Sequence, residues 1–130
     1  MAKKTYQGSC HCKAVRFEAG IDLAEGTGKC NCTSCWKKRW WSCRAKPEDF
    51  KLLSATTTLS NGERGGFCKQ CGVHVYGFVD KADWNPAAYV SIGVNALDDL
   101  DPAELLESPI KYMDGRKDDW WHVPAETGHL

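Results

Sequence analysis

The sequence predicts a small, mainly β domain built from short strands. Along residues 14–19 apolar side chains alternate with polar ones, so that Val15, Phe17 and Ala19 share one face of a half-buried strand. Turn signals rich in glycine and asparagine recur at short intervals, whereas helical signals are few and brief. Many short strands with almost no helix indicate a mainly β fold.

Similar patterns mark further elements along the chain. We expect strands at residues 14–19, 40–45, 50–53, 56–60, 73–79 and 88–94, with turns at 26–28, 61–62, 65–66 and 85–86. Pro47 begins a single helical turn at 46–50, and Asp101 caps a short helix at 101–106. The chain contains no repeat or linker, so we expect one domain over residues 1–130.

Charge and hydropathy argue against nucleic acids and membranes as partners. Lysine plus arginine and aspartate plus glutamate number 17 each, so the formal net charge is zero, unlike the basic footprint of a nucleic-acid binder. No apolar stretch reaches the roughly 18 residues of a membrane span, and no apolar signal-peptide segment follows the N-terminal lysines. These observations predict a soluble cytoplasmic protein, in which eight cysteines favour metal binding over disulfides.

Seven of the eight cysteines fall into three clusters. The clusters are Cys10-His-Cys12, Cys30-Asn-Cys32-Thr-Ser-Cys35 and Cys68-Lys-Gln-Cys71. Paired cysteines in tight turns supply two thiolates from one loop, and zinc takes four ligands in a tetrahedron. Three such clusters in one chain predict bound zinc. Their seven thiols are enough to hold two zinc ions.

Spacing alone does not decide which clusters share an ion. The middle cluster already has three thiols within six residues, whereas the outer clusters have two each and together complete one tetrahedron. This division predicts a closed, structural site with the ligands Cys10, Cys12, Cys68 and Cys71. It predicts a second site with the ligands Cys30, Cys32 and Cys35. A site with three protein ligands keeps a position for water or substrate, which is typical of catalytic zinc.

Cys43 lies alone between Ser42 and Arg44 in an expected strand. It is either a buried small hydrophobic residue, the interpretation that we favour, or a fourth ligand of the middle cluster. A fourth ligand would close the middle site and argue against catalysis there.

The ordered clusters and their flanks resemble the glutathione-dependent formaldehyde-activating enzyme family, which includes the centromere protein V group. The segments that carry the resemblance are 8–18, 30–35, 67–72 and 94–99, followed by the Trp120-Trp121 pair. They span nearly the whole chain. The resemblance implies a β-tent fold, in which pairs of antiparallel sheets surround a structural zinc on the first and third clusters. It also implies a catalytic zinc on the middle three cysteines.

Two departures from the family pattern concern the surroundings of the clusters. Lys13 stands where the family usually has glycine, so the backbone there must accept a side chain or turn differently. Segment 36–41, Trp-Lys-Lys-Arg-Trp-Trp, is bulky and basic and would border the second metal. Its cations form a solvated face by default, or a site for the carboxylates of glutathione. Its tryptophans pack on the core by default, or wall a pocket.

The resemblance implies an enzyme, a zinc-dependent carbon–sulfur lyase that joins a thiol such as glutathione to formaldehyde or a related small aldehyde. Three thiolates give the metal centre a net negative charge, which favours thiol activation over carbonyl polarisation. No residue identifies itself as a general acid or base: His11 could orient a ligand, and His74 and His122 are expected to be ordinary sheet or surface residues. The alternative function is a non-catalytic zinc module that binds a protein or nucleic acid.

Overall fold

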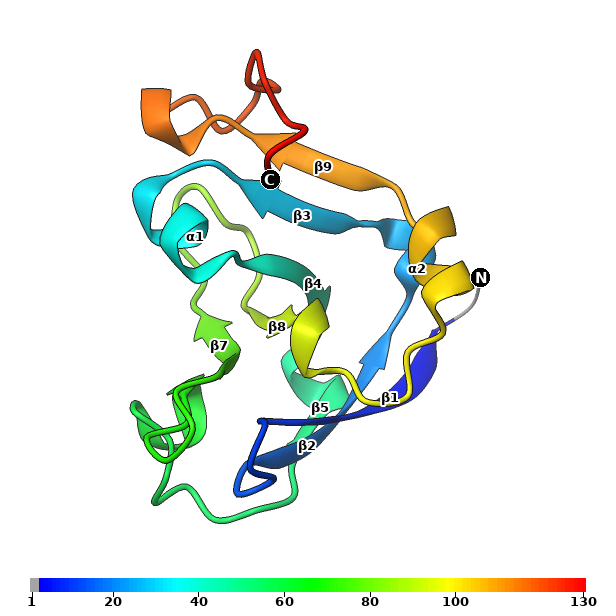
Figure 1. The fold of residues 1–130 in the computed structure, drawn as a ribbon, viewed down its shortest axis with the longest axis vertical. Helices are drawn as coiled ribbons and strands as arrows, with labels where there is room; N and C mark the ends of the chain where they lie inside the picture. The colour runs from blue at the N-terminus through cyan, green and yellow to red at the C-terminus, as the bar shows by residue number, and fades with distance from the viewer. Residues whose placement is uncertain (1–2) are drawn as a thin grey trace.

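The structure is a computed structural model that describes residues 3–130, and nine strands in that range form two sheets (Figure 1). The smaller sheet contains β1 (Lys4–Ser9), β2 (Arg16–Ile21) and β5 (Phe50–Leu52), in the order β1-β2-β5. The larger contains β3 (Thr27–Cys30), β4 (Trp41–Ala45), β6 (Gly65–Phe67), β7 (His74–Val79), β8 (Tyr89–Gly93) and β9 (Ile110–Met113). Its order is β6-β7-β8-β4-β3-β9, and only the β3–β9 pair is parallel.

The helices are short and lie between strands. Helix α1 (Thr33–Lys38) follows β3, and α2 (Pro102–Glu107) precedes β9. The 3-10 turns are Leu23–Glu25, Pro47–Asp49, Gly62–Arg64, Val94–Ala96 and Gly115–Lys117. Across residues 3–130, no helix is long and apolar enough to cross a membrane. The mainly β prediction is confirmed.

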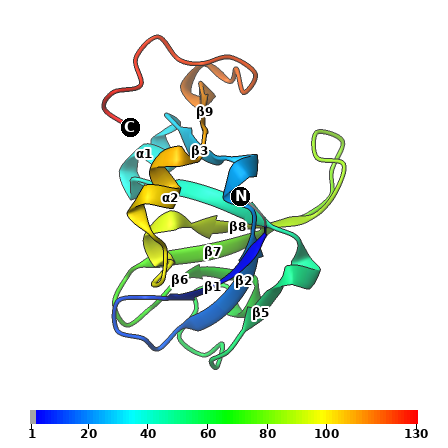
Figure 2. The same cartoon turned by 90° about the vertical axis from the view of Figure 1, so that its right-hand side faces the viewer.

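Side chains from both sheets meet in one core, and the sheets lie against each other (Figure 2). Strand β2 contributes Phe17, Ala19 and Ile21, none more than 1% exposed, which confirms the alternation predicted there. The ring centroid of Phe17 lies 5.4 Å from that of Phe50 and 5.7 Å from that of Tyr76. Such aromatic contacts add to the stability gained by apolar burial. These contacts hold β2 against β7. The outer cysteine clusters lie in the turns that precede these two strands, so the contacts also keep the clusters close together.

The local helix signals are confirmed. The Asp101 carboxylate caps α2 by accepting the N–H of Ala103 at 2.9 Å, and Pro47 stands at the start of its 3-10 turn. The hydroxyl of Tyr6 donates to the Glu104 carboxylate at 2.9 Å, which attaches α2 to β1.

Three local expectations are wrong. The turn expected at 26–28 ends at Gly26, because Thr27 and Gly28 already belong to β3. Residues 56–60 form a turn rather than a strand, because this segment wraps around the β6–β7 turn, and its Thr58 carbonyl accepts the N–H of Lys69 at 2.7 Å. Gly65 and Gly66 do not form a turn but belong to β6, with φ angles of 99° and 96°. The sequence also gave no sign of α1, β1, β3 or β9.

Candidate metal centres and the adjoining pocket

Four thiols from the two sheets meet at one point. Cys10 and Cys12 lie between β1 and β2, and Cys68 and Cys71 lie between β6 and β7. Their Sγ atoms all lie within 4.8 Å of one another. The structure therefore assembles the four thiols that the sequence placed in one site, and this four-cysteine group links the two sheets.

Both turns of the four-cysteine group fold through a left-handed residue after the second cysteine. Lys13 has a φ angle of 68° and Gly72 one of 79°. The N–H of Lys13 donates to the carbonyl of Cys10 at 3.3 Å, and that of Gly72 donates to the carbonyl of Cys68 at 2.7 Å. Lys13 thus adopts a conformation that favours glycine. Its ammonium group donates to the Ser9 hydroxyl at 2.9 Å, which anchors the side chain.

The spacing of these sulfur atoms fits tetrahedral metal coordination. The Sγ of Cys12 lies 3.7 Å from that of Cys10 and 3.7 Å from that of Cys68. A tetrahedron with metal–sulfur bonds of about 2.3 Å has sulfur–sulfur edges of about 3.8 Å. Desolvation raises the pKa of Cys71, but hydrogen bonds from the N–H groups of Val73 and Cys12 and from nearby thiols lower it overall to about 6. The group therefore supplies a thiolate near neutral pH, which is the form that binds metal.

A second group of three thiols forms where β3 passes into α1. Cys30 ends β3, Cys32 caps α1 and Cys35 lies in its first turn, and their Sγ atoms are all within 4.8 Å of one another. The N–H of Cys32 donates to the Sγ of Cys30 at 3.4 Å, and the N–H of Cys35 donates to the Sγ of Cys32 at 3.4 Å. Burial raises the pKa of Cys32, but the hydrogen bonds from Cys35 and Cys30 lower it overall.

The segment after β9 closes one side of this three-cysteine group. Asn31, in the middle of the C-N-C stretch, is 9% exposed, and its amide donates to the Asp114 carboxylate at 2.9 Å. The side-chain oxygen of Asn31 accepts a hydrogen bond from the backbone N–H of Arg116 at 3.1 Å. The backbone carbonyl of Asn31 accepts one from the guanidinium Nε of Arg116 at 2.6 Å. A Cβ atom on Gly115 would lie 2.6 Å from the Sγ of Cys30, so this close approach requires glycine. Segment 114–116 therefore holds the three-cysteine group in place.

Cys43 lies outside both groups. It is 2% exposed in β4, and its thiol donates to the carbonyl of Ile92 at 3.7 Å. Burial raises its pKa to about 12, so it remains a neutral thiol. In the β3–β4 pairing Gly28 faces Ser42, which places Cys43 about three residues, or roughly 10 Å, from the level of Cys30. The interpretation of Cys43 as a buried small hydrophobic residue is confirmed.

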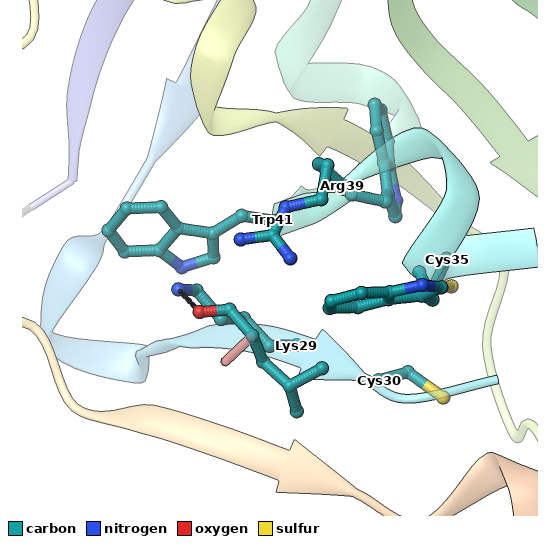
Figure 3. A pocket seen from close by; sticks show the side chains of 8 residues that line it. Lys29, Cys30, Cys35, Arg39 and Trp41 are labelled. Carbon is teal, nitrogen blue, oxygen red and sulfur yellow. Dashed lines mark hydrogen bonds between the residues drawn. The ribbon is translucent and has the colours of Figure 1, made fainter. Parts of the chain in front are cut away.

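A hollow of about 170 Å³ adjoins the three-cysteine group (Figure 3). Cys30 and Cys35 lie at one end of it and Trp41 at the other, and Lys29 and Arg39 point into the space between them (Figure 3). The remaining walls are Trp36, Trp40 and Leu130. The default expectation that the tryptophans pack on the core is therefore wrong for Trp36 and Trp40, while Trp41 both lines the pocket and packs against the core.

The glutathione-dependent formaldehyde-activating enzyme family matches residues 5–108, a range that contains both cysteine groups. The chain belongs to this family. A crystal structure of a protein from Rhodobacter sphaeroides is also similar, with 24% sequence identity and a TM-score of 0.61. The match covers 81% of this chain and 99% of that chain, and it shows that the two proteins share a fold.

In this formaldehyde-activating family member, several residues beside the three-cysteine group escaped the sequence reasoning. The position of Asn31 between two clustered cysteines was a usable signal, whereas Asp114 and Arg116 follow more than 80 residues later without a motif. Lys29 was missed because nothing in the sequence marks a single lysine in a strand as a pocket residue. The histidines match expectation: His74 lies in β7, and His122 is exposed, with Nδ1 2.8 Å from the Asp119 carboxylate.

Proposed function

We propose that this chain is a zinc-dependent carbon–sulfur lyase that combines a thiol such as glutathione with formaldehyde or a related small aldehyde. In this proposal Cys30, Cys32 and Cys35 hold a catalytic zinc, and the four-cysteine group holds a structural one. Residues 1–130 act as a single domain in the cytoplasm, a reducing location that suits eight free thiols. Family membership supports the chemistry, and the cysteine groups support the metals.

The observation that carries the proposal is the open side of the three-cysteine group. Zinc takes four ligands, and catalytic sites leave one position to substrate or water. Among residues 3–130, one group brings four thiols within 4.8 Å and the other brings three. The pocket of about 170 Å³ begins at Cys30 and Cys35. Cys30 and Cys35 line one end of this pocket, so the three-cysteine group lies directly beside a hollow that a small molecule can enter.

The chemistry requires a thiolate near neutral pH and a positioned aldehyde. Zinc held by three thiolates would lower the pKa of an incoming thiol. The N–H groups of Cys32 and Cys35 stabilise negative charge on the neighbouring sulfur atoms. In the addition, sulfur attacks the carbonyl carbon and a carbon–sulfur bond forms. The carbonyl π pair moves to oxygen, which takes up the proton lost by the thiol, so no oxidant or reductant is needed.

Thiols add to formaldehyde without a catalyst, so the test compares rates. We would follow formation of the S-hydroxymethyl adduct of glutathione by NMR exchange, with and without the protein, and measure bound zinc in the same sample. We expect a rate above that of buffer, which Cys32→Ala abolishes and Cys43→Ser, a matched loss of one thiol, preserves. A fully metal-loaded protein that adds nothing to the buffer rate would reject the lyase and leave the non-catalytic zinc module.

A further inference from the structure

The sulfur atoms of the three-cysteine group face away from the adjoining hollow. Cys30 and Cys35 line the hollow, but their sulfur atoms point out of it (Figure 3). On the side of the sulfur atoms, a Cβ atom on Gly115 would lie 2.6 Å from the Sγ of Cys30 and 2.9 Å from the Cβ of Cys32. The same atom would lie 2.7 Å from the ring carbon Cη2 of Trp120. The segment after β9 and the indole of Trp120 therefore lie beside the sulfur atoms.

We infer that the indole of Trp120 covers the side of the three-cysteine group on which its sulfur atoms lie, and that this cover determines which ligands reach a metal held there. A small ligand passes the indole, whereas a bulky one must displace it. The inference rests on the second zinc of the proposed function, but not on the proposed reaction. It adds a specificity-determining residue from outside residues 5–108, the range that the family matches.

The indole can fill the space beside the sulfur atoms without binding a metal itself. The part of Trp120 that faces Gly115 is a ring carbon, which is not a metal ligand. The indole nitrogen acts only as a donor, and it donates to the Asp118 carboxylate at 2.9 Å. The edge of an aromatic ring carries partial positive charge, so it tolerates the negative charge of three thiolates. Trp120 therefore covers the group without supplying a fourth ligand.

The cover has a firmly held base and a more weakly held ring. Its base, segment 114–116, is hydrogen-bonded to the side chain and the backbone of the buried Asn31. The ring is hydrogen-bonded to Asp118, an exposed residue of the same short loop. Trp120 is itself 41% exposed, so solvent reaches part of the ring. A ligand can therefore displace the ring by breaking a hydrogen bond between exposed groups, while the base stays in place.

A cover and a packing residue have different effects on metal binding. A residue that only packs beside the cysteines and steadies them strengthens metal binding, so its loss raises the Kd for metal. A cover slows the entry and the exit of metal and of competing ligands alike. Its loss therefore raises both rates by a similar factor and leaves the Kd nearly unchanged.

The first experiment measures zinc exchange in the full, zinc-loaded chain. We would follow transfer of zinc to the coloured chelator 4-(2-pyridylazo)resorcinol and measure the Kd by competition. The zinc that is missing from Cys32→Ala identifies the three-cysteine group. We expect Trp120→Ala to release this zinc about tenfold faster with a Kd within about twofold of wild type. Trp121→Ala, which removes the same side chain from a neighbour that is 78% exposed, should change neither quantity.

Two outcomes of this experiment would overturn the cover. Unchanged exchange in Trp120→Ala would show that the indole does not limit access, and a raised Kd with an unchanged rate of zinc entry would make Trp120 a packing residue. Should Trp120→Ala fail to fold, Asp118→Asn replaces the charged acceptor of the indole N–H by a neutral one of the same size. We expect it to speed exchange about two- to threefold, because the ring is held less tightly, and unchanged exchange would overturn the cover.

The second experiment tests selection by size. We would replace zinc by Co²⁺ and titrate the protein with ethanethiol and with the bulkier 2-methylpropane-2-thiol, following the visible absorption of the metal. The four-cysteine group has a full set of ligands, so changes on thiol binding report the three-cysteine group. We expect a preference of about tenfold for ethanethiol, which Trp120→Ala reduces several-fold and Trp121→Ala retains. An equal preference in wild type and Trp120→Ala would overturn the role of Trp120 in specificity.

These outcomes are distinct from failure of the proposed function, because zinc exchange and thiol binding are measured without an aldehyde. Faster exchange in Trp120→Ala, together with no acceleration of adduct formation by the wild-type protein, would reject the lyase and retain the cover. Acceleration of adduct formation, together with unchanged exchange in Trp120→Ala, would retain the lyase and reject the cover.

Discussion

The two cysteine groups of this chain differ in how far apart their members lie along the sequence. The four-cysteine group joins turns of two different sheets, and Cys12 and Cys68 are 56 residues apart. The three-cysteine group forms within six residues at the junction of β3 and α1. Closing a long loop fixes distant parts of a chain relative to one another, whereas closing a short one fixes little beyond itself.

Because of this difference, we expect metals at the two groups to contribute differently to folding. A metal at the four-cysteine group would hold the β1–β2 and β6–β7 turns together, so its binding energy would be part of the folding energy. A metal at the three-cysteine group would be held by a segment that already has other anchors, namely the β3–β9 pairing and the hydrogen bonds of Asn31. The second group can therefore leave a ligand position open without loss of the fold.

The largest effect is expected from Cys71→Ala. Structural zinc contributes about 10–16 kcal/mol in small zinc-dependent domains, which equals or exceeds the whole stability of about 5–15 kcal/mol of a typical domain. We therefore expect the variant to lose cooperative unfolding and to aggregate. Circular dichroism, thermal unfolding and zinc content of the purified variant measure this outcome. A metal-depleted variant that unfolds cooperatively near the wild-type temperature would show that the four-cysteine group is not structural.

A smaller effect is expected from Cys32→Ala, which sharpens the contrast between the groups. The variant should remain folded with about one zinc fewer per chain, because the two sheets and the four-cysteine group are intact. Elemental analysis and thermal unfolding, run beside Cys71→Ala, report both properties. Global unfolding comparable to that of Cys71→Ala would contradict the division into a structural and a dispensable metal.

Asn31→Leu tests the anchors of the three-cysteine group without removing a ligand. The leucine has similar size but cannot donate to the buried Asp114 carboxylate or accept from Arg116. Loss of hydrogen bonds that orient metal ligands commonly weakens metal binding about 10- to 100-fold. Competition with a chelator measures the retention of each zinc. Asn95→Leu, whose amide donates to the His74 carbonyl away from this group, is the control, and equal retention in both variants would count against the anchor.

The cysteine groups could be read from the sequence because each is built from local motifs. Three C-x-C or C-x-x-C stretches are visible in the chain itself, and the alternation of β2 is visible for the same reason. The surroundings of the three-cysteine group come from distant segments: Asn31 meets Asp114 across 83 residues, and Lys29 meets Leu130 across 101. Local patterns carry no information on such contacts.

The same reasoning explains the local expectations that were wrong. The consecutive glycines Gly65 and Gly66 indicated a turn, but their positive φ angles occur inside β6, beside the bulge where its pairing with β7 shifts. Residues 56–60 contain β-branched side chains typical of a strand, yet they wrap around the β6–β7 turn. In both places tertiary contacts override local preference.

The smallest effect is expected from Cys43→Ser, the cysteine that belongs to neither group. Serine is close in size to cysteine but binds zinc poorly, and Cys43 is buried with its thiol donating to the Ile92 carbonyl. Burying a hydroxyl there should cost roughly 1–3 kcal/mol of stability, part of which a hydrogen bond to that carbonyl offsets. Both zincs should remain after mild chelation, because neither loses a ligand. The raised pKa of the Cys43 thiol, about 12, also means that iodoacetamide should not modify it in the folded protein at neutral pH. Loss of one zinc from the serine variant would make Cys43 a ligand of the three-cysteine group, close its open position and remove the basis for catalysis there.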